Sequence, residues 1–124
     1  MRTRSLLLSA AAALLASCSP YGACTLIGCE NGLFVRFNQS PAGAFRIEAS
    51  VAGNDAVEVI ECADASSCHL LFRDLIADQV TLRVVTQQGT FTQQFEPEYE
   101  NLYPNGRRCG PACRQGTVTF QLPG

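Results

Sequence analysis

The chain has 124 residues, of which 47% are hydrophobic and 16% charged, so it is long enough for one domain with a core and too short for two. All nine basic residues are Arg, and 11 acidic residues give a formal charge of −2, a balance that argues against nucleic-acid binding. The single His excludes a metal site built on two His ligands and leaves one imidazole for acid–base catalysis.

Residues 1–17 have the pattern of a secretory signal peptide. Arg2 and Arg4 precede an uncharged apolar run from Leu6 to Leu15. This run of about ten residues is half of the roughly twenty that a membrane-spanning helix needs. The pattern therefore predicts an exported protein from which this segment is removed.

The end of that segment, Leu15-Ala16-Ser17-Cys18, resembles the lipobox of bacterial lipoproteins. The resemblance covers residues 1–18 only. It implies that Cys18 becomes the first mature residue and carries a diacylglyceryl group, with a further acyl chain such as palmitate on its amino group. Several acyl chains together hold a protein stably in a membrane. In that family, Ser19 after the Cys implies the outer membrane, facing the periplasm, in a host with two membranes. The alternative is an ordinary signal peptide with Cys18 as a further disulfide partner.

The mature chain is expected to consist of an anchor and short tether, residues 18–23, and one folded domain, residues 24–124. From Ser19 to Ala23 the tether spans at most about 18 Å, which keeps the domain near the bilayer. With 11 acidic residues against seven Arg, the mature domain has a formal charge of about −4.

Apolar and polar residues alternate with period two through most of the domain, which predicts strands. In chain order the expected strands are residues 33–37, 45–51, 57–59, 70–73, 80–84, 91–95 and 117–122. Turn signals separate them, and Gln87-Gln88-Gly89 indicates a hairpin. The one helical possibility is a turn in residues 73–78, with Leu75 and Ile76 packing inward.

About seven short strands predict an all-β fold, an antiparallel β-sandwich. It resembles immunoglobulin-like or prealbumin-like sandwiches in strand count alone, a likeness that carries no function.

The six remaining cysteines predict three disulfides in an exported domain. They are Cys24, Cys29, Cys62, Cys68, Cys109 and Cys113. Six cysteines allow fifteen pairings, and we favour pairing of sequence neighbours, with Cys62–Cys68 joining the ends of two adjacent strands. The alternative joins Cys24 or Cys29 to the 109–113 segment, which would tie the two ends of the domain together.

The segment Cys109-Gly110-Pro111-Ala112-Cys113 is similar to the C-G-P-C motif of the thioredoxin family, with one Ala inserted. The CxxxC spacing and the strand pattern that follows favour a structural disulfide over a thiol of lowered pKa. A redox role, or Cu(I) binding by Cys109 and Cys113 together with His69, is kept as an alternative.

Other candidate chemistry is weaker. Ser66, Ser67 and His69 are close in sequence, but no nucleophile-elbow glycine pattern accompanies them. Glu96, Glu98 and Glu100 alternate around Pro97, which is typical of a solvated edge, with Ca²⁺ binding as the alternative. We therefore expect neither an enzyme nor a cofactor.

Residues 99–114 are expected to be the longest irregular segment and the first place to look for a recognition surface. Candidate contacts for an envelope protein partner are Tyr99, Leu102, Tyr103, Arg107, Arg108 and Arg114. Tyr99, Leu102 and Tyr103 would form an exposed apolar patch in this surface, or alternatively pin the segment to the sandwich as tyrosine corners do. The function expected is a non-enzymatic binding or accessory module. The alternative is an inhibitor of a cell-wall-attacking enzyme or protease that uses a disulfide-closed 99–114 loop.

Overall fold

The computed structural model describes Cys24, residues 28–110 and residues 112–124, and the predicted signal peptide and tether lie outside these residues. The described chain contains eight strands and no helix. In chain order they are β1 (Gly32–Phe37), β2 (Phe45–Val51), β3 (Asn54–Cys62), β4 (Leu71–Arg73), β5 (Val80–Thr86), β6 (Gly89–Phe95), β7 (Tyr99–Leu102) and β8 (Cys113–Phe120).

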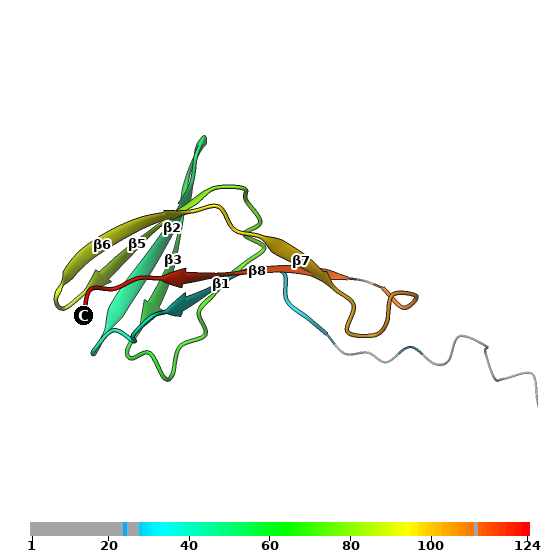
Figure 1. Ribbon diagram of the computed structural model, residues 1–124, viewed down its shortest axis with the longest axis horizontal. Coiled ribbons are helices and arrows are strands. Elements are labelled where there is room, and N and C mark those ends of the chain that lie inside the picture. The colour runs from blue at the N-terminus through cyan, green and yellow to red at the C-terminus, as the bar shows by residue number, and fades with distance from the viewer. Residues whose placement is uncertain (1–23, 25–27, 111) are drawn as a thin grey trace, which may run out of the picture.

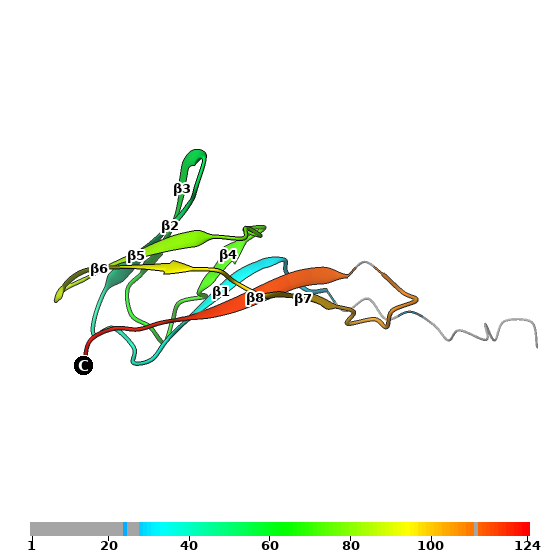
Figure 2. The ribbon, with the colours of Figure 1, turned by 45° about the horizontal axis from the view of Figure 1, so that its top comes forward.

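The strands form two four-stranded sheets, ordered β4-β1-β8-β7 and β3-β2-β5-β6 (Figures 1 and 2). This confirms the predicted all-β sandwich. One pair departs from the antiparallel prediction, because β1 and β8 run parallel, with Gly32 opposite Gln115 and Phe37 opposite Phe120. Parallel neighbours need a long connection, and here most of the domain lies between the two strands.

The core lies between the inner faces of the sheets, as the alternation predicts. In β2 the buried residues Phe45, Ile47 and Ala49 alternate with partly exposed ones. Strands β1, β5 and β8 contribute the rest of the central layer, namely Leu33, Val35, Val80, Leu82, Val84, Val118 and Phe120. Phe37 closes one end of this layer, since its ring packs edge-on against Phe45 and Phe120 at centroid distances of 5.6 and 6.0 Å.

The turn predictions have different outcomes. The hairpin at Gln87-Gln88-Gly89 is confirmed, because β5 and β6 pair up to Thr86 opposite Gly89. Residues 74–79 form no helix and instead carry the chain from β4 in one sheet to β5 in the other. In this crossing Leu75 packs against the core as predicted, whereas Ile76 is 38% exposed, so its inward placement was wrong.

The disulfide Cys62–Cys68 is confirmed, with a Cα–Cα distance of 5.5 Å. It joins Cys62, the last residue of β3, to Cys68, shortly before β4, and these two strands belong to different sheets. The bond therefore closes the loop that crosses from one sheet to the other, and it does not join two strands that pair with each other.

Candidate functional site

Strands β7 and β8 form an arm that extends away from the two packed sheets (Figures 1 and 2). We use "the arm" for residues 99–114. Its ladder runs from Tyr99 opposite Gly116 to Leu102 opposite Cys113. Strand β1 begins opposite Gln115, so the first two residues of β8 extend beyond it and pair only with β7. The prediction of an irregular segment was therefore wrong at its two ends, which are paired strands, whereas residues 103–110 and 112 lie outside any strand.

Two disulfides tie the arm to the N-terminal segment, Cys24–Cys109 and Cys29–Cys113, with Cα–Cα distances of 5.5 and 6.0 Å. The favoured local pairings Cys24–Cys29 and Cys109–Cys113 were wrong, and the alternative that ties the ends of the domain together is the one formed. The parallel β1–β8 pair is the physical reason. Because both strands start at the same end of the sheet, the cysteines that precede β1 lie beside those at the start of β8.

Hydrogen bonds fasten the segment before β1 to the base of the arm. The Gln115 side chain donates to the Glu30 carbonyl at 2.7 Å, and the Arg114 N–H donates to the Asn31 side chain at 2.8 Å. The Asn31 carbonyl in turn accepts the Asp74 N–H at 2.9 Å. Together with the two disulfides, these bonds fix the orientation of the arm relative to the sandwich.

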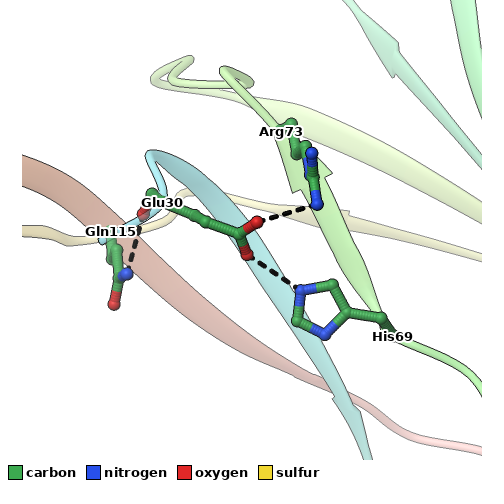
Figure 3. Close-up of polar contacts among 4 residues, drawn as sticks. All are labelled: Glu30, His69, Arg73 and Gln115. Atoms are coloured by element: carbon green, nitrogen blue, oxygen red, sulfur yellow. Dashed lines mark hydrogen bonds and ion pairs between the residues drawn. The ribbon is translucent and has the colours of Figure 1, made fainter. Parts of the chain in front are cut away.

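The Glu30 carboxylate joins two side chains from the β4 region (Figure 3). One oxygen is 2.8 Å from the Arg73 guanidinium and the other is 3.0 Å from His69 Nε2. The His69 ring also packs edge-on against Phe34, with centroids 5.9 Å apart. All three polar side chains are substantially exposed, so this cluster is a surface contact that links the N-terminal segment to β4.

His69 does not meet the cysteines of the CxxxC segment. Its Nε2 faces Glu30, and Cys109 and Cys113 are each bonded to a different cysteine. Within the part of the chain that the structure describes, no group of three or more His, Cys, Asp or Glu side chains is placed to hold a metal ion. The arrangement expected of a CxxxC metal site is therefore not brought together there.

The serines near His69 have a local partner. The Ser66 hydroxyl donates to Asp64 at 2.7 Å, and the Ser67 N–H donates to the same oxygen at 2.9 Å. These bonds, that of the Ser66 hydroxyl above all, stabilise the charged carboxylate and lower the pKa of Asp64. The residues form a turn within the Cys62–Cys68 loop, and the Ser66 hydroxyl is directed to Asp64 rather than to His69.

Two of the six predicted contact residues hold the arm in place. The Tyr99 hydroxyl donates to the Ala77 carbonyl and accepts the Ala77 N–H, both at 2.9 Å. The Arg114 guanidinium lies over the Tyr99 ring, 5.4 Å from its centre. Gly116, opposite Tyr99 in β8, gives the ring room, because a Cβ there would lie 2.9 Å from Tyr99 Cδ1. Tyr99 therefore pins the arm to the sandwich, as the tyrosine-corner alternative proposed.

The other four predicted contacts lie exposed at the outer end of the arm: Leu102, Tyr103, Arg107 and Arg108. The Arg107 guanidinium is 5.7 Å from the centre of the Tyr103 ring. The Gly106 N–H donates to the Tyr103 carbonyl, and the Cys109 N–H donates to the Gly106 carbonyl. We call these four residues the arm end. On a disulfide-tied turn they place the Arg107 guanidinium near the Tyr103 ring, with exposed Leu102 and Arg108 next to these two residues in the chain.

Sequence reasoning did not single out Glu30, Asn31 or Arg73. Their contacts depend on β1, β4 and β8 being neighbours, and no local sequence signal reports that. The acidic residues Glu96, Glu98 and Glu100 are exposed in and beside the link from β6 to β7, as a solvated edge requires. No described segment is a helix long and apolar enough to cross a membrane.

Comparison with known proteins adds no identification. No known protein family, curated protein or solved structure matches the chain.

Proposed function

We propose that this protein is a lipid-anchored, non-enzymatic binding module at the periplasmic face of the envelope, on the outer membrane. Cys18 carries the lipid, the sandwich is a rigid support, and the arm end is the contact surface. The observation that carries the proposal is the arm itself. It projects from a small sandwich, is held by two disulfides, and presents exposed Leu102, Tyr103, Arg107 and Arg108.

The Cys24–Cys109 disulfide supports a contact close to the membrane. Cys24 is six residues after Cys18, and six extended residues span about 20 Å. An anchor at Cys18 therefore keeps the arm end near the bilayer, within reach of other envelope proteins. Paired cysteines also suit an oxidising compartment outside the cytoplasm.

The arm end suits a protein partner with an acidic surface beside an apolar one. Arginine forms two-pronged hydrogen bonds with carboxylates, and Tyr and Arg are enriched among the residues that dominate interface energetics. Fixing the arm before binding reduces the entropy lost on association.

The test is capture of the partner by lipidated protein in its own membranes, after cross-linking. The variant Tyr103→Ala/Arg107→Ala/Arg108→Ala should reduce specific capture by roughly tenfold or more, because hot-spot residues each contribute about 2 kcal/mol. The control, Arg36→Ala/Arg83→Ala, removes two exposed arginines from the sandwich and should leave capture unchanged. Equal capture by the wild-type and triple-variant proteins would refute the arm end as the contact.

An inhibitor of a cell-wall-attacking enzyme or protease is the second candidate, favoured by the same rigid arm. The arm would enter the enzyme's active site. It is held by Cys24 and Cys29, and not by a bond between its own cysteines. Inhibition by the intact protein that disappears on reduction would support this candidate, whereas an intact protein without inhibitory activity would remove it.

A thiol or copper function of Cys109 and Cys113 is the third candidate. Mass spectrometry of protein from membranes, alkylated before reduction, separates it from the others. A lipid adduct on Cys18 with no labelled thiol supports the anchored binding module. Labelled Cys109 and Cys113 would favour thiol chemistry.

A further inference from the structure

Strand β3 is an open edge of the second sheet. It pairs with β2 along one side, and no strand in the described part of the chain pairs with its other side. At nine residues it is the longest strand, and it is largely exposed. With β2 it forms a hairpin that projects from the sandwich on a different side from the arm (Figures 1 and 2). An edge of this kind offers free backbone N–H and C=O groups to another strand.

The side chains of β3 divide into two faces through their register with β2. Val57 and Val59 lie opposite Ser50 and Glu48 on the outer face, where they are 53% and 49% exposed. These are the two most exposed large hydrophobic side chains among the described residues. Ile60 and Glu58 lie on the inner face, opposite Ile47 and Ala49. Ile60 packs against the core, so the apolar side chains available to an added strand are Val57 and Val59 on the outer face.

The charges of β3 are all negative. Glu61 lies next to Val59 in the outer-face row, and Glu58 lies between the two valines on the inner face. Asp55 precedes Val57 at the point where the register with β2 shifts. Arg46 is opposite Glu61, but its guanidinium pairs with Glu48, which also pairs with Arg83. The structure gives no ion pair to Asp55, Glu58 or Glu61 within the described residues.

This charge pattern disfavours a second copy of the chain as the added strand, because the edge carries three negative charges and no positive one, so two copies of it would repel each other in any register. The antiparallel register that pairs Val57 with Val59 of the other copy places Glu58 against Glu58 and Asp55 against Glu61. Like charges directly opposite each other destabilise a sheet. The same carboxylates favour an added strand that carries positive charge at the matching positions.

We propose that the free edge of β3 binds an extended, basic segment of a partner protein as an added strand of the sheet. The partner segment has a defined pattern: basic, any, apolar, basic, apolar, any, basic. In antiparallel register its outer basic residues meet Glu61 and Asp55, its apolar residues meet Val59 and Val57, and its central basic residue meets Glu58. Backbone hydrogen bonds provide much of the affinity, and the alternating side chains provide specificity. This site is separate from the arm end and does not depend on lipidation of Cys18.

The test is an NMR titration of the mature, disulfide-intact chain with the peptide Lys-Thr-Val-Lys-Val-Thr-Arg. The expected result is shift changes and slowed amide exchange confined to β3 and the strand beside it. A scrambled peptide of the same composition should bind at least tenfold more weakly, because it keeps the charge but loses the register. Equal binding of both peptides, or shift changes located elsewhere, would overturn the proposal.

A charge reversal sharpens the test. The variant Glu58→Lys/Glu61→Lys should weaken binding of the basic peptide by roughly tenfold or more. The control Glu98→Lys/Glu100→Lys makes the same change in charge away from β3 and should leave binding within about twofold. The acidic peptide Glu-Thr-Val-Glu-Val-Thr-Glu should bind the β3 variant in preference to the wild type. The proposal would also be overturned if the acidic peptide showed no preference for the β3 variant, or if the protein formed concentration-dependent dimers that protect β3.

Discussion

Tyr99 and Tyr103 lie four residues apart in the arm, and their surroundings give them different roles. The Tyr99 hydroxyl makes two hydrogen bonds with the backbone of Ala77, and its ring lies close against Gly116 and near the Arg114 guanidinium. Tyr103 is 40% exposed and contacts Arg107. One tyrosine therefore fixes the arm and the other is available for binding.

The substitution Tyr99→Phe should destabilise the protein, because it removes the hydroxyl and leaves the Ala77 N–H and C=O without that partner. A partly buried pair of this kind corresponds to a loss of about 1–3 kcal/mol in the free energy of unfolding. Urea denaturation of the disulfide-intact protein measures it.

The matched control is Tyr103→Phe, which removes a hydroxyl from the same arm at an exposed position. It should change the free energy of unfolding by less than about 0.5 kcal/mol. Equal effects of the two substitutions would contradict the anchoring role of Tyr99.

Among the elements, the parallel pairing of β1 and β8 has the largest influence on which distant parts of the chain are joined. It brings residues that are 84 and 85 apart in the chain to bonding distance, in two neighbouring disulfides. These two bonds are not independent. Once one of them closes the long loop, the other closes only a small ring formed by residues 24–29 and 109–113.

Removing the disulfides should therefore have a non-additive effect on stability. Loop entropy assigns about 3 kcal/mol to the loss of either bond alone and about 7 kcal/mol to the loss of both. The variants are Cys24→Ser/Cys109→Ser, Cys29→Ser/Cys113→Ser and their combination, compared by urea denaturation. If the combined loss equals the sum of the two single losses, the two bonds close loops independently and this account fails.

For the whole molecule, the arm and the edge of β3 are separate surfaces on one small sandwich (Figures 1 and 2). The Cys24–Cys109 bond joins the start of the domain to the arm. An anchored molecule would therefore hold its arm towards the bilayer and leave the β2–β3 hairpin more distant. The mature domain is acidic overall, whereas the arm end carries two arginines, and an anionic surface would favour the same orientation.

This orientation can be measured on lipidated protein in bilayer discs that contain a paramagnetic headgroup lipid. Amides between residues 103 and 108 should relax faster than those of residues 53–56 in the β2–β3 turn. Breaking the tie with Cys24→Ser/Cys109→Ser should reduce the difference. Equal relaxation in the two regions of the wild-type protein would contradict the orientation.

The features that the sequence predicted best are those whose signals are local. Alternation in β2 and β5 identified the buried faces, and Gln87-Gln88-Gly89 identified a hairpin. The sequence also singled out the four residues of the arm end, because arginines beside a Pro/Gly turn are recognisable without a fold, and the structure places all four at the surface. Their role as a contact surface stays a prediction. Val57 and Val59 were predicted as a strand, but their exposure depends on β3 being an edge.

The sequence by itself therefore determined the all-β class, the strand faces and the short Cys62–Cys68 bond, because each depends on residues a few positions apart. It also predicts the lipid anchor at Cys18. Only the tertiary structure decided that β1 and β8 are parallel neighbours, which cysteines join the arm to the N-terminal segment, and which tyrosine is fixed. The first two features depend on contacts between residues more than 80 positions apart, and the third depends on hydrogen bonds between Tyr99 and Ala77, 22 positions apart. The choice among alternatives is made by the packing of the whole sandwich.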